Sequence, residues 1–182
     1  MSSKFPVTWI VLLGLMLGIS IAAVMDSQKI DDSNFVFGSA HEHASLAVKI
    51  QGASFDFTLE KYQLQSPFIH FENNNGYVVH RHSVGVTIGY LFETLNFGLS
   101  KECIVIDDGR KFCTDNVDSL KFFINGRQVE NIRDYIIFDG DIILISYGDE
   151  TQNELEQQFK EQIERGFPFQ IRDRNANNLA KV

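Results

Sequence analysis

The longest uncharged segment of the chain lies next to its amino terminus. The residues from Phe5 to Met25 contain no charged side chain, and as a helix they are long enough to cross a bilayer core of about 30 Å. Lys4 precedes the segment and Asp26 follows it, so the positive-inside tendency places the amino terminus in the cytoplasm. The pattern predicts a single-pass transmembrane anchor at residues 1–25, with the rest of the chain on the extracytoplasmic side of the cell membrane.

A cleaved signal peptide is the alternative interpretation of this segment. Residues 20–22, Ser-Ile-Ala, are small enough to serve as a cleavage site. The apolar run nevertheless continues to Met25 and exceeds the usual apolar region of about 7 to 15 residues, which favours an uncleaved anchor. Both interpretations export the remainder of the chain.

The exported part of the chain is acidic. Lys4 is the only charged residue before Asp26, so removing it from the net charge of −8 leaves −9 for the remainder. Phosphate binding relies on clustered Lys and Arg, so nucleic acid is not an expected partner. Composition divides the chain into the anchor at 1–25, a polar linker at 26–40, one folded domain at 41–148, and a carboxy-terminal amphipathic helix with a tail at 149–182.

Alternating apolar and polar residues predict a domain built mainly from β-strands. A short helix is expected at residues 86–97, with Thr87 as its N-cap. Together these elements predict an α+β roll of antiparallel and mixed strands with one central helix. The strands are expected at residues 44–50, 54–59, 67–72, 77–82, 120–124, 128–129 and 141–147, and a further hairpin at 103–113.

The segment from Asp149 to Arg165 predicts a second helix with a narrow apolar seam. Leu155, Phe159 and Ile163 recur four residues apart among charged and amide side chains. The seam either docks the helix onto the domain or receives a partner protein.

Clustered histidines are the clearest indication of function. All of them fall between positions 41 and 82, and four lie in two His-X-His steps. Residues i and i+2 of a strand point to the same side, so each step presents two imidazoles, and His70 shares a side with Glu72. Imidazole is the commonest metal ligand. The candidate ligands are His41, His43, His70, His80 and His82.

Convergence of these histidines depends on the register of one hairpin. If the turn centres on Asn75, His70 lies opposite His80, and both share a face with Glu72 and His82. A two-residue turn at Asn75-Gly76 would shift the pairing by one and put His70 and His80 on opposite faces. The first register is favoured because it brings the histidines and Glu72 together on one face. Turn statistics favour the second register.

A nitrogen-rich site of this kind suits Zn²⁺ or Cu²⁺. Glu42 and Glu72 are the nearby carboxylates expected to orient the ligating rings, because such rings usually donate their second N–H to a carboxylate or carbonyl. Metal-dependent hydrolysis would need one of these two carboxylates as its base, and no catalytic residue is assigned. Histidines that merely pack and bond locally are the alternative.

The two cysteines flank the turn of the 103–113 hairpin. A turn centred on Asp108 makes Cys103 and Cys113 cross-strand neighbours, and an exported domain favours a disulfide between them. A redox-active pair is the alternative, although exchange catalysts usually carry Cys-X-X-Cys at the start of a helix.

Several motifs together resemble a known group of proteins. His-Glu-His at 41–43, Ile-His-Phe-Glu at 69–72 and His-Arg-His at 80–82 resemble an uncharacterised family of exported or membrane-anchored prokaryotic proteins, sometimes filed as protein-disulfide isomerase related. The resemblance spans roughly residues 41–148. It implies thiol–disulfide exchange at Cys103 and Cys113 as an alternative activity.

The carboxy-terminal half of the domain carries a second resemblance, which concerns fold alone. An Asn125-Gly126 turn and an Asp139-Gly140-Asp141 turn before the final strand are similar to β-grasp domains of the ubiquitin and sulfur-carrier kind. This likeness implies a β-grasp-like roll. Carrier chemistry is not implied, because the chain continues past Gly148 with Asp149.

The expected function is therefore transition-metal binding for metal handling or sensing. The protein would be a membrane-anchored, extracytoplasmic domain that holds copper or zinc through its histidines. Two alternatives remain: isomerase-like exchange at the cysteines, and a metal-free module that docks a membrane-protein partner.

Overall fold

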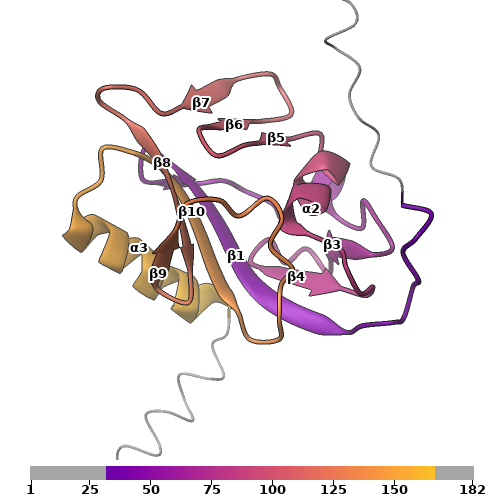
Figure 1. The fold of residues 1–182 in the computed structure, drawn as a ribbon. Coiled ribbons are helices and arrows are strands. Elements are labelled where there is room, and N and C mark those ends of the chain that lie inside the picture. Colours follow the sequence, from indigo (N-terminus) through magenta and orange to yellow (C-terminus); the bar gives the residue numbers. More distant parts are fainter. Residues whose placement is uncertain (1–31, 167–182) are drawn as a thin grey trace, which may run out of the picture. The chain divides into compact units, whose positions relative to one another are not determined.

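The computed structural model describes residues 32–166, which adopt a mixed α+β fold made mostly of sheet (Figure 1). This part of the chain contains two α-helices, and neither is long and apolar enough to cross a membrane. The predicted anchor at 1–25 and the tail beyond residue 166 lie outside the described residues.

The larger sheet is organised around a parallel pair formed by its first and last strands. β1 and β10 pair in parallel, and β1 pairs antiparallel with β4 on its other side. Along the sheet the order is β3-β4-β1-β10-β8-β9, with the short β2 attached to β1. The strands are β1 (Glu42–Ile50), β2 (Ala53–Ser54), β3 (Ile69–Phe71), β4 (Val78–Arg81), β8 (Ser119–Ile124), β9 (Arg127–Val129) and β10 (Ile142–Gly148).

A second sheet and the helices complete the domain. The helix α2 (Ile88–Thr94) begins as predicted, because the Thr87 side chain accepts a hydrogen bond from the Tyr90 N–H. The helix α3 (Gln152–Gly166) lies along β1 and β10. The remaining elements are the 3-10 turn η1 (Glu60–Tyr62) and the sheet of β5 (Gly98–Leu99), β6 (Cys103–Val105) and β7 (Lys111–Cys113).

Side chains along β1 alternate between the two faces of the larger sheet, and both faces are packed against other parts of the domain. Leu46 and Val48 point to one side and are buried in the aromatic core. Ala47 points to the other side, where it packs with Leu155 and Phe159 of α3. His43 of β1 and His41 just before the strand share the parity of Ala47, so they project from the face that carries α3.

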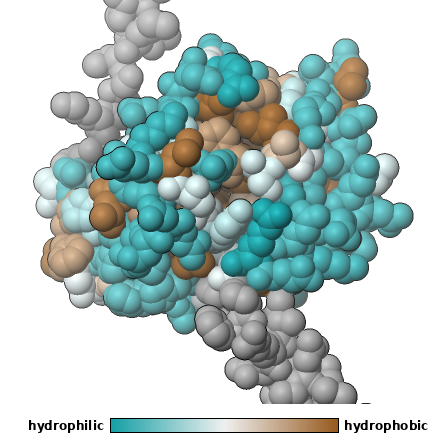
Figure 2. All heavy atoms as spheres, turned by 180° about the vertical axis from the view of Figure 1, so that it is seen from behind, coloured by the Kyte–Doolittle hydropathy of each residue, from teal (hydrophilic) through white to brown (hydrophobic). Residues whose placement is uncertain are grey.

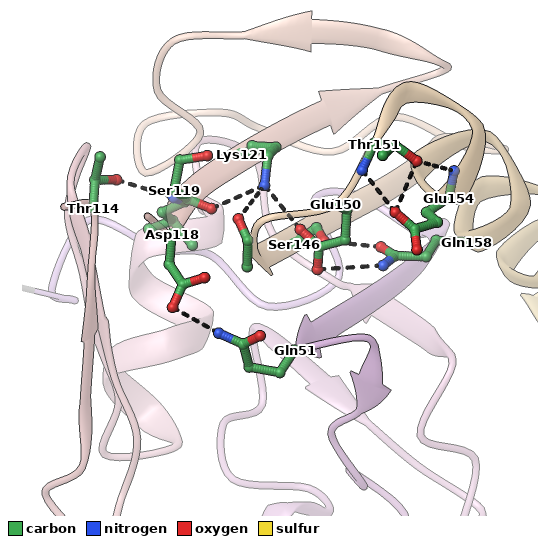
Figure 3. A network of polar contacts seen from close by, with 12 residues as sticks. Gln51, Thr114, Asp118, Ser119, Lys121, Ser146, Glu150, Thr151, Glu154 and Gln158 are labelled. Atoms are coloured by element: carbon green, nitrogen blue, oxygen red, sulfur yellow. Dashed lines mark hydrogen bonds and ion pairs between the residues drawn. The ribbon is translucent and has the colours of Figure 1, made fainter. Parts of the chain in front are cut away.

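The contact between α3 and the sheet also includes polar side chains. Gln158 accepts a hydrogen bond from Ser146 at 2.8 Å, and the Gln162 amide donates to the Ser45 hydroxyl. Lys121 and Glu150 extend this network beside the start of the helix (Figure 3). The helix therefore docks on the sheet, but buried amides hold it as much as the predicted apolar seam does.

One predicted strand is much shorter than expected. The pattern at 54–59 predicts a strand, whereas β2 ends at Ser54. Asp56 explains the difference, because its side chain accepts hydrogen bonds from both the backbone N–H and the hydroxyl of Thr58. This local turn diverts the chain from the sheet and delivers Phe57 into the core.

Figure 2 shows the molecule from the side opposite to that of Figure 1. This side is mostly hydrophilic, with some patches of hydrophobic residues. Isolated apolar side chains of this kind are normal on protein surfaces. The large hydrophobic residues that are exposed in the described part of the chain are Val36, Phe37, Leu59, Leu64, Val84, Val117 and Phe138.

The predicted disulfide between Cys103 and Cys113 is confirmed. The two residues lie directly opposite each other on β6 and β7, and their sulfur atoms are bonded. The bond closes a loop with a sequence separation of 10.

Replacing both cysteines with serine is expected to lower the free energy of unfolding by about 2–3 kcal/mol, since the bond restricts the unfolded chain. Urea titration of the oxidised wild type and the double variant measures the difference. Equal midpoints and slopes would contradict the expectation.

Candidate metal centre

The structure brings three histidines into one row across three adjacent strands. His70 on β3 is paired with His80 on β4, and His80 is paired with His43 on β1. The register centred on Asn75 is therefore confirmed. Asn73 and Asn74 adopt left-handed backbone conformations in this turn, at φ of 58° and 55°, which widens it beyond a two-residue loop.

All five predicted histidines form one connected cluster of rings. His41 lies beside both His43 and His82, with ring centres 4.8 and 5.0 Å apart. His43 and His80 are separated by 4.6 Å, and His70 and His82 by 5.0 Å. Residues as far apart in the chain as His41 and His82, which are 41 positions apart, thus share one surface of the sheet.

His70 is the most buried member of the cluster, and one of its ring nitrogens has a fixed role. Nδ1 lies 2.6 Å from the Ser66 carbonyl oxygen. A carbonyl only accepts hydrogen bonds, so Nδ1 carries a hydrogen and donates it to Ser66. Nε2 is buried and finds no hydrogen-bond partner among residues 32–166.

The Glu72 carboxylate lies between two imidazoles. Oε2 is 3.4 Å from His70 Nε2, and Oε1 is 3.6 Å from His80 Nδ1. The first of these contacts is within ion-pair distance but is not a hydrogen bond, since Nε2 has no hydrogen-bond partner among the described residues. A proton or another cation between the two atoms would satisfy both.

Asp139 orients His43, and the sequence interpretation missed it. Its Oδ1 lies 3.2 Å from His43 Nδ1 and also accepts the His43 backbone N–H at 3.0 Å. The Gly140 N–H donates to the His43 carbonyl oxygen at 2.8 Å. The Asp139-Gly140 turn was recognised, but nothing in the sequence indicated that it would meet β1.

Glu42 does not reach the imidazoles. Its position between His41 and His43 points it to the opposite side of β1, where Oε1 lies 3.8 Å from a guanidinium nitrogen of Arg81. Of the two carboxylates predicted to orient the rings, the structure therefore brings only Glu72 to them.

Burial keeps the central imidazoles neutral. It lowers the pKa of His80 to about 4, and repulsion from His43, His70 and His82 adds to the shift while Glu72 opposes it. Burial also lowers the pKa of His82, followed by the effects of His70 and His41. Both rings consequently hold free lone pairs at neutral pH, as metal ligation requires.

The domain is expected to lose stability as pH falls through this range. The unfolded chain protonates His80 near pH 6.5, whereas the folded chain resists until about pH 4. Stability is therefore complete above pH 6.5 and decreases between the two values, by roughly 2–3 kcal/mol for His80. Urea titrations across this range measure the loss.

The variant His80→Gln separates the contribution of His80 to the pH dependence of stability from the contribution of the carboxylates. The variant is expected to show a flatter profile between pH 6.5 and 4. A profile parallel to that of the wild type would contradict the assignment to His80.

Within residues 32–166, no group of three or more His, Cys, Asp and Glu side chains is arranged so that it could hold a metal ion. Ligation at this face would therefore require the rings to turn about their side-chain torsions. The outer torsion of histidine is broad and turns at small cost.

Comparisons of the chain with models of protein families, with curated proteins and with solved structures returned no match.

Proposed function

We propose that this protein is a membrane-anchored, extracytoplasmic domain that binds copper or zinc at its histidine cluster, for metal handling or sensing. One observation carries the proposal. The buried His70 Nε2, which has no hydrogen-bond partner among the described residues, lies 3.4 Å from a Glu72 oxygen. A metal cation between the two atoms would satisfy both.

The separation of these atoms fits a first-row metal ion. Two ligand atoms bound at about 2.1 Å to one ion with a tetrahedral angle lie about 3.4 Å apart. The distances from Glu72 to His70 and His80 are 3.4 and 3.6 Å. Both values support an ion held between the carboxylate and the two imidazoles.

The ring separations support the same chemistry. Two imidazoles on one ion have centres about 5 Å apart, since the Zn–N bond is about 2.0–2.1 Å and each ring nitrogen lies roughly 1 Å from the ring centre. Four pairs in the cluster have centres between 4.6 and 5.0 Å apart. The rings of His70 and His80, on either side of Glu72, are stacked with centres 6.2 Å apart, so an ion shared by these two would require them to turn toward each other.

His70 already has the support that metal-bound histidines usually have. Its second nitrogen donates to a backbone carbonyl, which orients the ring and raises the basicity of Nε2. Imidazole nitrogens favour zinc and copper over calcium or magnesium, which prefer oxygen ligands.

The proposed fold and location rest on separate observations. The order β4-β1-β10-β8-β9, with a central parallel pair of first and last strands and the intervening α2, supports a β-grasp-like roll. The uncharged run from Phe5 to Met25 supports the anchor, and Lys4 before it and Asp26 after it favour a location of the histidine face outside the cell.

Metal analysis of the full chain in detergent tests the proposal. The wild type is expected to retain stoichiometric zinc or copper after dialysis against each ion in turn. The double variant His80→Gln/His82→Gln is expected to lose it. Thermal unfolding without metal confirms that the variant folds.

An exposed ion pair offers a matched control. Lys101 and Glu130 lie 3.5 Å apart at the surface, and replacing both with glutamine is expected to leave metal content unchanged. Absence of stoichiometric metal from the wild type, or its retention in the histidine variant, would end the proposal.

A further inference from the structure

We infer that an apolar patch formed by Val36, Phe37, Val84 and Phe138 rests on the surface of the membrane that holds the predicted anchor. The inference rests on the anchor of the proposed function and is independent of metal binding. The occupant of the patch is the lipid bilayer, at the boundary between its headgroups and its acyl chains. Contact there would give the domain a fixed orientation on the membrane.

Exposed hydrophobic side chains are concentrated at this patch. Its residues are 65%, 64%, 63% and 60% exposed, in chain order, and they are four of the seven large hydrophobic residues exposed between residues 32 and 166. A single exposed apolar side chain is normal, whereas a group of them is typical of a surface that contacts a partner protein or a membrane.

Contacts within the domain hold the first three residues of the patch in place. The Ser39 hydroxyl donates to the Val36 carbonyl oxygen at 2.6 Å and accepts the Val84 N–H at 3.0 Å. Phe37 follows Val36, and its ring centre lies 5.7 Å from that of His82. The exposure of Val36 and Phe37 is therefore a property of the fold and not of a loose chain end.

Arg81 links Phe138 to the same region. Its Nε donates to the Ile137 carbonyl oxygen at 3.0 Å, and a second guanidinium nitrogen donates to the Ser83 carbonyl oxygen at 2.8 Å. Phe138 follows Ile137 in the chain, and Val84 follows Ser83. One buried side chain thus holds both of these loops.

The length of the linker limits how far the patch can lie from the bilayer. Residues 26–31 separate Met25, the end of the predicted anchor, from Asp32, and a fully extended chain covers at most about 25 Å over this interval. Val36 follows four residues after Asp32. An anchor that ends at Met25 would therefore keep this part of the domain close to the membrane.

The patch borders the histidine cluster. The ring of His82, which lies beside Phe37, has its centre 5.0 Å from that of the exposed His41. Asp139, which orients another imidazole of the cluster, follows Phe138 in the chain. A patch that rests on lipid would hold the imidazoles at the membrane surface, so metal ions would enter and leave the cluster next to the bilayer.

Apolar burial, and not charge, would drive this contact. Asp32 is exposed, and the side chain of Asp139 is 67% exposed. Anionic headgroups attract basic segments and repel such carboxylates. A zwitterionic phosphatidylcholine surface is therefore the expected partner.

Lipid quenching of a fluorophore on the full chain in phosphatidylcholine vesicles tests the inference. The only two cysteines of the chain are bonded to each other, so a nitrobenzoxadiazole label attaches only to an introduced cysteine, Phe37→Cys or Val84→Cys. Interfacial side chains lie about 5–10 Å into the boundary of headgroups and acyl chains, so lipids with a nitroxide near the headgroup are expected to lower the emission of both labels about twofold.

Val117→Cys provides a labelled position away from the patch. Val117 is 74% exposed. The neighbouring Asp118 accepts a hydrogen bond from Gln51 at 2.8 Å, just beyond the end of β1 that lies about 25–30 Å from Glu42. Nitroxide lipids are expected to leave the emission of this label unchanged.

Removal of the aromatic rings separates the patch from the label itself. With the label at Val84→Cys, the variant Phe37→Ser/Phe138→Ser is expected to reduce quenching to the level of the Val117→Cys control. Both rings are exposed, and thermal unfolding confirms that the variant folds. Unchanged quenching would show that the label alone makes the contact and would overturn the inference.

The remaining outcomes distinguish this inference from the proposed function. Equal quenching at all the labelled positions, or none at Phe37→Cys and Val84→Cys, would overturn the inference and leave the anchor and metal binding intact. Loss of the full chain from the vesicles in a carbonate wash would remove the anchor and the inference with it. Quenching confined to the patch in a chain that binds neither zinc nor copper would support the inference and end the proposed metal function.

Discussion

Replacing Glu72 with glutamine is expected to lower the affinity for Zn²⁺ or Cu²⁺ by about 10–100-fold while stabilising the metal-free chain by about 1 kcal/mol. The two effects have opposite signs because the same carboxylate favours a bound cation and, without one, lies 3.4 Å from the buried His70 Nε2 with no hydrogen bond between them. A glutamine amide can donate to the buried Nε2, which has no hydrogen-bond partner among the described residues. Metal competition against a chelator and urea titration measure the two changes.

Glu42 provides a closely matched control for this substitution. Its side chain is 30% exposed, as is that of Glu72. Glu42 lies on β1 and faces Arg81 instead of the imidazoles. Glu42→Gln is expected to leave metal affinity unchanged. Equal loss of affinity in both variants would indicate a general effect of acidic charge and would contradict a specific role for Glu72.

Replacing Lys121 with methionine is expected to destabilise the fold by about 3–5 kcal/mol, the typical result of removing one partner of a buried ion pair. Lys121 Nζ donates to Glu150 Oε2 at 2.8 Å and to the Gly148 carbonyl oxygen at 2.7 Å (Figure 3). The side chains of Lys121 and Glu150 are only 13% and 7% exposed. Burial raises the pKa of Glu150, but the Lys121 hydrogen bond and other contacts outweigh it and leave the pKa below its usual value.

The double variant Lys121→Met/Glu150→Gln separates the ion pair from simple packing. Without the carboxylate no uncompensated charge remains, so the double variant is expected to recover most of the lost stability. Urea titration of the wild type, both single variants and the double variant completes the cycle. A single-variant loss below about 1 kcal/mol, or no recovery in the double variant, would contradict a strong buried pair.

Much of the local structure could be predicted from residue patterns. Alternation located most of the strands, and Thr87 identified the start of α2. The i, i+2 rule placed His80 and His82 on one face. These features depend on neighbours in the sequence, which is where pattern-based reasoning is strongest.

The remaining features depend on distant parts of the chain. Asp139 meets His43 across 96 positions, and no periodicity records such a contact. The face of α3 was predicted from Leu155, Phe159 and Ile163, whereas Gln158 and Gln162 are buried because serines of the sheet face them. The prediction for Glu42 could have been corrected from the sequence alone. Glu42 lies between His41 and His43, so alternation along a strand points its side chain to the opposite face from theirs.

The pairing of the first and last strands has a consequence for how the domain folds. The β3–β4 hairpin and the β1–β4 pair join residues that are fairly close in the chain, but the pairing of β1 with β10 must wait for residues that are synthesised almost 100 positions later. Contacts of such long sequence separation slow folding, so His70 and His80 come together before Asp139 can clamp His43. All five histidines lie on or beside β1, β3 and β4, so they can gather before the strand that closes the sheet is in place, and the contact of Asp139 with His43 would form last.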